Sequence, residues 1–312
     1  MKSRSVLCLG GCVIDRVGET VDAKERLHTS NIGRMRSSLG GVARNVAENL
    51  ALLGIPVRLL SRVGDDPEGE RIIAVSSRAG IDMTRVTRDS QTATASYTAI
   101  FNGEGELVIG LADMSIFEAI TPENAVEAIA AAAADTVLFA DANLQPATLQ
   151  AIAGAKSGRM LASVPVSIQK LARLAPILAD LDILFLNLHE ARALLGGEGS
   201  AESLAARLAN GPVPRGLLTL GPRGALGWAD GKVTAIPALA SSPVNVNGAG
   251  DALAGATLAR LATGDDFILA ARRAMAAAAL TVESPHTVRA DLTMSALLAR
   301  YELSQPTETI IP

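Results

Sequence analysis

The sequence predicts an α/β protein with a doubly wound, mostly parallel β-sheet flanked by helices. Short apolar runs alternate with helical segments along most of its 312 residues, which is the pattern of repeated βα units. Apolar residues make up 49% of the chain and aromatic residues only 3%, which favours a core of alanine, leucine and valine. A chain of this length can bury enough apolar surface to fold without disulfides. These observations favour one large domain, with or without a small appendage.

The first part of the chain predicts two strands, each followed by a helix. Residues 6–9 form a short apolar run that ends at two glycines, and residues 57–63 form a second run. Between them, residues 41–53 carry an apolar stripe with helical spacing, and Gly54 and Pro56 suit the end of that helix. A further helix is expected from Pro67 to about Ala79.

Beyond residue 113, helix and strand alternate again, which predicts further parallel strands. The expected strands are 137–140, 160–164, 183–186 and 216–219, followed by a late hairpin of 226–229 and 233–235. The expected helices are 121–134, 146–155, 168–179, 189–195, 201–209, 250–263, 266–280 and 291–301.

Two segments interrupt this pattern and predict a small β lid. Residues 17–38 are polar and weakly periodic, whereas residues 92–112 alternate around a glycine-rich turn, as a hairpin does. A hairpin with a polar face does not fit inside a parallel sheet, so we assign both segments to a lid. The main α/β domain is then formed by 1–16, 39–91 and 113–312. Unpaired strand edges on such a lid favour pairing with a second copy, so we expect a homodimer through the lid.

Charge and hydropathy exclude several kinds of partner. The net charge of −4 lacks the basic excess of a nucleic-acid-binding surface. The alanine-rich runs 128–134 and 274–280 are too short to span a membrane, and the apolar run after Met1 is too brief for a secretory signal. Cys8 and Cys12 are predicted to be buried thiols, because no second cysteine pair completes a metal site. We therefore expect a cytoplasmic enzyme that acts on a small molecule.

The most informative stretch is Gly248-Ala249-Gly250-Asp251, which leads directly into a helical run. Small residues at the start of a helix let backbone N–H groups surround an anion at the positive end of the helix dipole. A carboxylate beside an anion site is expected where it takes a proton from a group that attacks the anion. The stretch therefore predicts a phosphoryl-transfer centre, with backbone amides holding the phosphate and Asp251 as the base. The alternative is a turn that only permits close packing; neither the P-loop nor the dinucleotide fingerprint is matched.

A second group of residues is suited to a sugar. Gly40 and Gly41 allow close approach of a ligand, and Asn45 follows in the first helical turn, where its amide can donate and accept. Asp15, just beyond the first strand, could accept hydrogen bonds from two neighbouring hydroxyls. The alternatives are a solvated helix start for Asn45 and a turn residue for Asp15.

Two strand ends later in the chain are suited to a nucleotide and its metal. Asn187 and Glu190 place an amide and a carboxylate three residues apart, where they could hold the waters of a Mg²⁺ ion. The competing interpretation of this pair is an ordinary helix cap. Thr219-x-Gly221-x2-Gly224 follows another strand and allows close passage over a nucleotide, although it could also be a simple turn.

Taken together and in order, these motifs resemble the ribokinase-like (PfkB) family of sugar and nucleoside kinases over nearly the whole chain. The matching motifs are Asp15, Gly40-Gly41-x3-Asn45, Val63-Gly64-Asp65-Asp66-x2-Gly69, Asn187-x2-Glu190, Thr219-x-Gly221-x2-Gly224 and Gly248-Ala249-Gly250-Asp251. Within the family, the chain is most similar to the subgroup that acts on pseudouridine, through residues 40–50, Asp113-Met114-x-Ile116, Ala119-Ile120-Thr121, Ala140-Asp141-x-Asn143 and Asn245-Val246-Asn247.

The resemblance implies transfer of the ATP γ-phosphate to a ribose 5′-hydroxyl with Asp251 as base. It implies an anion hole from Gly248, Ala249 and Gly250, and a ribose site from Asp15, Gly40, Gly41 and Asn45. It places Asn187, Thr219, Gly221, Gly224 and Asn247 on the nucleotide side, with Mg²⁺ organised through water by Asn187 and Glu190. The lid would close over the substrate, where Ser30, Asn31 and Asp113 are candidates for contacts with the base or the adjacent ribose edge.

Three departures from the family pattern bear on these roles. Val164 stands where many relatives carry an acid, and Phe185-Leu186 stands where Lys-Pro is usual. Asn245 replaces an acid that is linked in many relatives to a monovalent cation, which argues against activation by K⁺. Two alternatives therefore stay open: a kinase of another nucleoside or of a ribose-like sugar, and a nucleotide- or sugar-binding relative without turnover.

Overall fold

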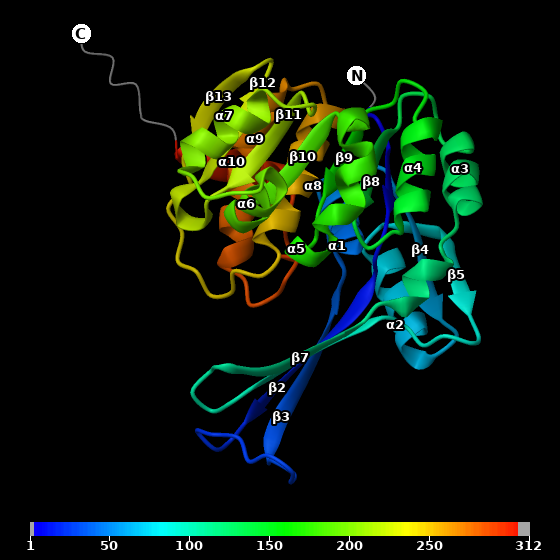
Figure 1. The fold of residues 1–312 in the computed structure, drawn as a ribbon, viewed down its shortest axis with the longest axis vertical. Coiled ribbons are helices and arrows are strands. Elements are labelled where there is room, and N and C mark those ends of the chain that lie inside the picture. The colour runs from blue at the N-terminus through cyan, green and yellow to red at the C-terminus, as the bar shows by residue number, and fades with distance from the viewer. Residues whose placement is uncertain (1–2, 305–312) are drawn as a thin grey trace.

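The structure, a computed structural model that describes residues 3–304, is built on two β-sheets (Figure 1). The larger sheet has nine strands in the order β13-β12-β11-β10-β9-β8-β1-β4-β5, and the smaller has four in the order β3-β2-β6-β7. The predicted α/β fold with a large, mostly parallel sheet is therefore confirmed.

The strands of the larger sheet run parallel from β11 to β5, and an antiparallel ribbon closes the other edge. The parallel strands are β1 (Val6–Leu9), β4 (Val57–Gly64), β5 (Asp82–Asp89), β8 (Val137–Asp141), β9 (Leu161–Val164), β10 (Ile183–Asn187) and β11 (Arg215–Thr219). The ribbon consists of β12 (Ala225–Ala229) and β13 (Lys232–Ile236). Strand order reverses at β1, between β4 on one side and β8 on the other, and ligands of doubly wound sheets bind at the carboxyl ends beside such a switch.

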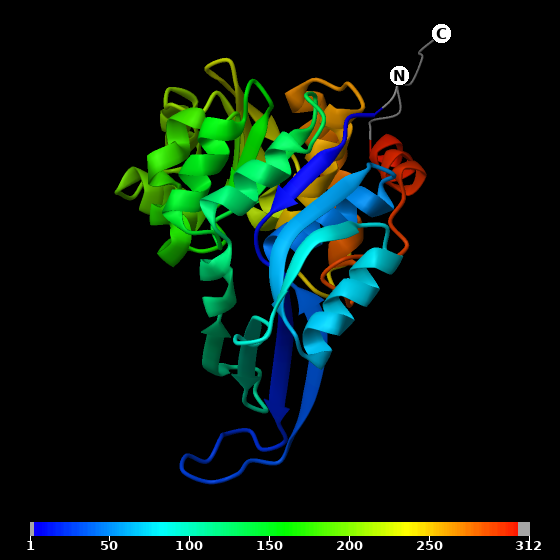
Figure 2. The same cartoon turned by 90° about the vertical axis from the view of Figure 1, so that its right-hand side faces the viewer.

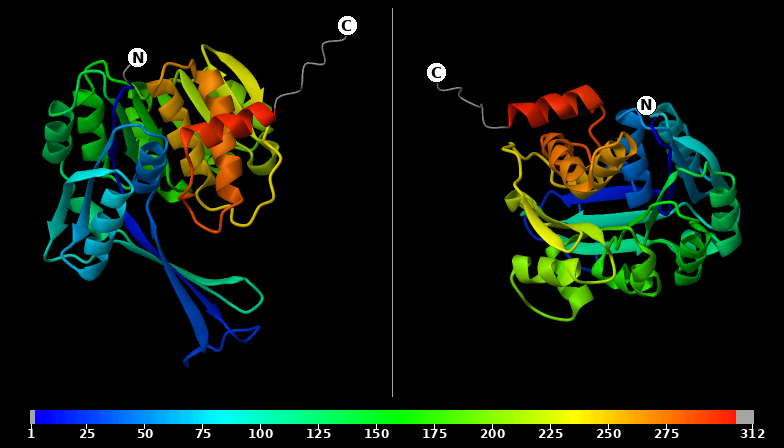
Figure 3. Two further views of the ribbon diagram at one scale, coloured as in Figure 1. Left: turned by 180° about the vertical axis from the view of Figure 1, so that it is seen from behind. Right: turned by 90° about the horizontal axis from the view of Figure 1, so that it is seen from above.

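Helices cover both faces of this sheet, and each face has its own core (Figure 3). One layer contains α1 (Val42–Leu52), α2 (Pro67–Arg78), α8 (Ala249–Ala262), α9 (Phe267–Val282) and α10 (Met294–Leu303). The other contains α3 (Pro122–Ala130), α4 (Pro146–Ala155), α5 (Ile168–Leu171), α6 (Leu188–Leu195) and α7 (Ala201–Ala209), with 3₁₀ turns η1 (Ser115–Ala119), η2 (Ala172–Asp180) and η3 (Gly221–Arg223). Alternation along β1 supplies both cores, since Val6 and Cys8 point into the first and Leu7 and Leu9 into the second. No helix within residues 3–304 combines the length and apolarity that a membrane span requires.

The smaller sheet projects from the body below the carboxyl edge of the larger one (Figures 1 and 2). Its strands are β2 (Val13–Thr20), β3 (Gly33–Gly40), β6 (Ser96–Phe101) and β7 (Leu107–Asp113), drawn from both of the segments that interrupt the α/β pattern. We call it the lid sheet. Its strands β2 and β3 continue to Val13 and Gly40, so that Asp15 lies on a lid-sheet strand. That the lid sheet closes over a substrate stays a prediction.

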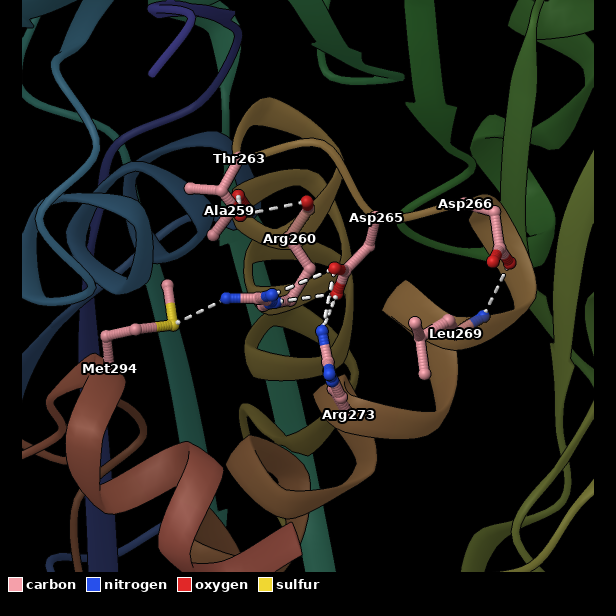
Figure 4. A network of polar contacts seen from close by, with 8 residues as sticks. All are labelled: Ala259, Arg260, Thr263, Asp265, Asp266, Leu269, Arg273 and Met294. Atoms are coloured by element: carbon pink, nitrogen blue, oxygen red, sulfur yellow. Dashed lines mark hydrogen bonds and ion pairs between the residues drawn. The ribbon is translucent and has the colours of Figure 1, made fainter. Parts of the chain in front are cut away.

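An ion-pair network fixes the far end of α8 to the helices around it (Figure 4). The Asp265 carboxylate accepts from Arg260 Nε at 2.8 Å and from Arg273 Nη1 at 2.7 Å, and Arg260 Nη1 also reaches Met294 Sδ at 3.5 Å. Asp266 then caps α9 by accepting from Leu269 N at 2.9 Å. These contacts join α8 to α9 and α10 at the carboxyl end of α8.

Three expectations from the sequence were wrong in detail. Strand β5 was missed because it is an edge strand, paired only with β4, and its charged residues hide the alternation. The helix expected to reach residue 134 ends at Ala130, where the chain turns back toward β8 and Arg159 binds the carbonyls of Ala132 and Ala133. The helix expected over 168–179 is one α-turn followed by η2, which contains Pro176, a residue that lacks an N–H to continue an α-helix.

Candidate active site

The amino-terminal ends of α1 and α8 bring together two side chains that are 206 residues apart in the sequence. Asn45 Nδ2, in the first turn of α1, donates to Asp251 Oδ2, in the first turn of α8, at 2.8 Å. Asn45 is buried and Asp251 is half-buried. Within residues 3–304, Asp251 Oδ1 receives no hydrogen bond from protein, so this oxygen remains free to accept from a ligand.

The first turn of α8 is open to an anion. Gly248 begins it with φ of +82°, and a Cβ there would lie 1.9 Å from the carbonyl oxygen of Thr287, so only glycine fits. No N-cap side chain caps this helix, a feature it shares with α1 and α4, whereas the other α-helices are each capped by their own N-cap side chain. A Cβ at Gly250 would meet nothing within 4 Å. Ala249 N donates to the Val246 carbonyl at 3.5 Å, and the N–H groups of Gly250 and Asp251 are available to hold a phosphate.

The surroundings of Asp251 tune it for proton transfer at neutral pH. Burial raises its pKa from 3.8 to about 7, and the negative charges of Asp141 and Asp15 act in the same direction. The hydrogen bond from Asn45 and the charge of Arg44 oppose this rise in pKa. A carboxylate with a pKa near the working pH is suited to general-base catalysis.

Asp15 lies on the root of the lid sheet and owes its place to a glycine on the neighbouring strand. A Cβ at Gly40 would lie 2.0 Å from Asp15 Oδ2, so any other residue would displace the carboxylate. Gly41 follows with φ of +91° and forms the turn into α1. Burial raises the pKa of Asp15 to about 6, while the charge of Arg44 lowers it. Asp15, Gly40, Gly41 and Asn45 thus meet at one end of the sheet, as the sequence predicts.

The residues expected on the nucleotide side lie along the same edge of the sheet. Asn187 and Thr219 are neighbours in the β10–β11 pair, and η3 carries the chain from Gly221 to Gly224 beside them. Asn247 follows Asn245, whose Oδ1 accepts from the Asn247 N–H at 3.0 Å. Nucleotide binding by these residues stays a prediction.

Asn187 and Glu190 form the helix cap that was the competing interpretation. Asn187 Oδ1 accepts from Glu190 N at 3.0 Å, and Glu190 Oε2 accepts from Asn187 N at 2.9 Å. Glu190 Oε1 is not used in this cap, so the carboxylate can still hold a metal-bound water. Among residues 3–304 no three acidic, histidine or cysteine side chains gather as a metal site, and Mg²⁺ binding by Asn187 and Glu190 stays a prediction.

Three predicted substrate residues are not brought to Asp251. Ser30 and Asn31 lie at the distal tip of the lid sheet, and the Asn31 side chain is engaged there with the backbone of Arg26, at 2.8 and 2.9 Å. Asp113 pairs with Ser96 and accepts from Ser115 Oγ at 2.8 Å, and its strand register places it on the opposite face of the lid sheet from Asp15. A substrate role for Ser30, Asn31 and Asp113 therefore stays a prediction that depends on closure of the lid sheet.

One carboxylate that matters to the site had no role assigned from the sequence. Asp141 is fully buried at the end of β8 and accepts from Gly11 N and Ala43 N, both at 3.0 Å, and from the backbone N and the Nδ2 of Asn143 at 2.9 and 3.0 Å. It therefore ties β1 and the start of α1 to β8. The sequence contains a sign of this role: Asp141 stands at the end of an apolar strand, and a charge buried there needs hydrogen-bond partners.

Fold and site together define an α/β phosphotransferase with an alcohol group as acceptor. The pfkB family carbohydrate kinase model matches residues 3–293, and the chain belongs to this family. It is thus a sugar or nucleoside kinase of the ribokinase-like group.

Relatives from bacteria and plants match the chain over nearly its full length. The pseudouridine kinase of Escherichia coli K12 is 27% identical over 309 residues, which cover 95% of this chain and 96% of that protein. A solved carbohydrate kinase from Agrobacterium tumefaciens superposes with a TM-score of 0.82 at 34% identity, covering 96% of this chain and 98% of the other. Arabidopsis thaliana ribokinase, solved with ribose and ATP, has a TM-score of 0.83 at 20% identity and shares the fold over 97% of this chain and 99% of its own.

Proposed function

We propose that this protein transfers the γ-phosphate of ATP to the 5′-hydroxyl of a ribonucleoside, and that pseudouridine is its acceptor. The observation that carries the proposal is the hydrogen bond between Asn45 and Asp251 beside the uncapped end of α8. Full-length similarity to a pseudouridine kinase supports the choice of acceptor.

The transfer follows from this geometry. Asp251 Oδ1 accepts the proton of the acceptor hydroxyl while the hydroxyl oxygen attacks the γ-phosphorus. The new oxygen–phosphorus bond forms as the bond to the β-phosphate oxygen breaks, and ADP leaves with the electron pair. The amides at the start of α8 stabilise the charge on the transferring group.

The ribose is held on the other side of Asp251. The Asp15 carboxylate accepts from ribose hydroxyls in the space that Gly40 leaves open, and Gly41 brings the backbone close to the sugar. Asn187, Thr219, Gly221, Gly224 and Asn247 are on the nucleotide side. Mg²⁺, held through water by Asn187 and Glu190, would neutralise phosphate charge.

An assay with a panel of acceptors tests this proposal. Pseudouridine, uridine, cytidine, adenosine and ribose are each incubated with ATP and Mg²⁺, and the product is located by ³¹P–¹H correlation. We expect the highest kcat/KM with pseudouridine and a phosphate on the 5′-oxygen. A higher kcat/KM with another nucleoside or with ribose would show that this compound, and not pseudouridine, is the acceptor. ATP binding without turnover on any acceptor would refute the proposed kinase activity.

We also propose that two copies associate through the lid sheet. Large apolar side chains on one of its faces are exposed, with Met35 and Ile109 each 59% and Leu111 68% accessible. Met35 and Ile100 meet over Gly18, so this apolar face is continuous across three strands. A second copy of the same face would bury it, because the apolar surfaces match when related by a two-fold axis. Light scattering should give a dimer that Ile109→Lys dissociates; a wild-type monomer at micromolar concentration would refute this.

A further inference from the structure

The buried arginine next to Asn45 controls which way the Asn45 amide points. The Arg44 side chain lies at the start of α1 and is 3% exposed. Its Nη1 donates to Asn45 Oδ1 at 3.0 Å, and its Nη2 pairs with Glu48 Oε2 at 2.5 Å, one turn further along α1. Longer contacts join Arg44 Nε to Ser76 Oγ at 3.4 Å and Nη1 to the Leu39 carbonyl at 3.5 Å. The guanidinium is therefore held from α1, α2 and the root of the lid sheet.

This contact leaves the Asn45 side chain one favourable orientation. A primary amide accepts only through its oxygen and donates only through its nitrogen, and an arginine only donates. With Asn45 Oδ1 against Arg44, the Nδ2 group is directed at Asp251. A rotated amide would set NH₂ against the guanidinium and oxygen against the carboxylate, losing both bonds. Asp251 Oδ2 is thus occupied by the hydrogen bond from Asn45, and Asp251 Oδ1 is left for the hydroxyl of the acceptor substrate.

The positive charge of Arg44 also acts on both carboxylates of the site. It lowers the pKa of Asp251 and that of Asp15, against the burial that raises both. An arginine keeps this charge at any working pH. Glu48 is the anion paired with Arg44. Besides Arg44 and Asp15, the charge of Asp141 also acts on Asp251 and raises its pKa.

We propose that Arg44 is a positioning residue for phosphoryl transfer, acting through Asn45 to hold the Asp251 carboxylate toward the acceptor hydroxyl. The inference rests on the proposed role of Asp251 as base. The contacts of Arg44 are with protein groups, and its ion pair with Glu48 holds the guanidinium beside Asn45.

A double-mutant cycle on kcat tests this coupling. We expect Arg44→Met to lower kcat about 10- to 100-fold, as misplacement of a catalytic group does, with KM for ATP within about twofold. In an Asn45→Ala background the same change should lower kcat by less than about threefold, because its target is gone. Arg44→Lys should recover only part of the loss, since lysine lacks the planar fork. Full additivity of the two single effects would overturn the proposal.

Two further variants separate this role from a loss of folding. Arg44→Met/Glu48→Gln removes the carboxylate that the single variant would leave without a partner, and it should show the same kcat loss with a wild-type far-UV spectrum. Arg58→Met is the matched control, because Arg58 also pairs with a carboxylate, Asp82, at 2.6 Å, but at the opposite end of the sheet. Its kcat should equal that of wild type.

An NMR measurement decides the proposal independently of the acceptor. In protein labelled with ¹⁵N at asparagine, the Asn45 side-chain signal is identified by its absence in Asn45→Ala. In wild type we expect one Asn45 Nδ2 proton with a strongly shifted signal and slow exchange with solvent. In Arg44→Met we expect its chemical shift and exchange rate to be those of an exposed amide. An unchanged Asn45 signal in Arg44→Met would overturn the positioning role. If wild type phosphorylates no acceptor, the proposed function fails, while this signal still shows whether Arg44 orients Asn45.

Discussion

Asp141 caps helix α1 from a strand that lies 98 residues away, because its Oδ2 accepts from the Ala43 backbone N–H at 3.0 Å. The same oxygen accepts from Gly11 N, also at 3.0 Å. One buried carboxylate thus aligns β8, the end of β1 and the start of α1, and α1 carries Asn45 to Asp251. The stability of the body and the geometry of the site share this residue.

Replacing this carboxylate should destabilise the protein. Asp141→Asn exchanges one acceptor oxygen for an NH₂ group that faces N–H donors, and we expect a loss of about 2–3 kcal/mol in the free energy of unfolding. Urea unfolding followed by circular dichroism measures it. Asp135→Asn, at an exposed turn, is the control and should change stability by less than about 0.5 kcal/mol. An equally small effect at Asp141 would show that the four hydrogen bonds do not hold these elements together.

Removing the catalytic charge should have the opposite effect on stability. The folded-state pKa of Asp251, about 7, lies above the unfolded value of 3.8, so its ionisation opposes folding at high pH. Asp251→Asn keeps an acceptor for Asn45, and we expect it to stabilise the protein by about 1–2 kcal/mol at pH 8, after allowance for partial exposure. The gain should shrink as the pH falls from 7 toward 4. A pH-independent difference in urea unfolding would show that the charge is not the cause.

The rate of transfer should depend on the ionisation of two carboxylates. Asp251 must be ionised to accept a proton, and its pKa of about 7 predicts that kcat/KM falls with unit slope below that pH. The Asp15 carboxylate accepts from hydroxyls more strongly when it is ionised, so the slope should steepen below about pH 6. The pH profile of Asp15→Asn should show only the fall below pH 7 that is due to Asp251, without the steeper fall below pH 6. A wild-type profile that stays flat down to pH 5 contradicts the role given to Asp251.

Gly40 should determine the affinity for the acceptor. A methyl group there would lie 2.0 Å from Asp15 Oδ2, so Gly40→Ala must move the carboxylate. We expect KM for the acceptor to rise about 10-fold or more, with KM for ATP unchanged, since a lost hydrogen bond to a charged group is worth about 1.5–3 kcal/mol. Gly197→Ala, where a Cβ meets nothing within 4 Å, should leave both constants at wild-type values. An unchanged acceptor KM in Gly40→Ala would remove Asp15 from the sugar site.

Transfer should not require K⁺. Asn245 Nδ2 donates to the Pro285 carbonyl at 3.2 Å, so an amide bridges the loop ahead of α8 and the loop after α9 without an ion. We expect equal rates, within about twofold, in potassium, sodium and tetramethylammonium chloride at constant ionic strength. A rise of tenfold or more in potassium would show that Asn245 does not replace a cation.

The sequence was sufficient for the fold and for the residues that depend on local backbone geometry. The pattern of Gly248 to Asp251 and that of Gly40 and Gly41 express constraints on neighbouring backbone, and the structure shows those constraints as close approaches and positive φ angles, while the roles of these residues in transfer stay predictions. Roles that depend on contacts distant in sequence could not be found in this way. The contacts of Asp141 with Ala43 and of Arg44 with Asn45 exist only in the folded protein, where β8 and α1 pack together. The apolar alternation of β5 is obscured because this strand lies at the edge of the sheet.

The lid sheet shows the same limit at the substrate site. Alternation and turn residues predict the β6–β7 hairpin, whereas the weakly periodic segment that holds β2 and β3 is assigned to the lid without strands of its own. The register of the sheet then decides which face each side chain takes. Asn31 fills the loop at the tip, and Asp113 lies across the lid sheet from Asp15. Composition does not reveal these placements, and contact of Asn31 and Asp113 with a substrate stays a prediction.

In the proposed reaction, the Asp251 carboxylate removes the proton of the acceptor hydroxyl. The most direct measurement is the single-turnover rate of γ-phosphate transfer in Asp251→Asn, compared with wild type and with Asp135→Asn, at saturating ATP and acceptor. General-base removal predicts a loss of about 10²- to 10⁴-fold in Asp251→Asn and none in the control. A rate within threefold of wild type would show that Asp251 is not the base.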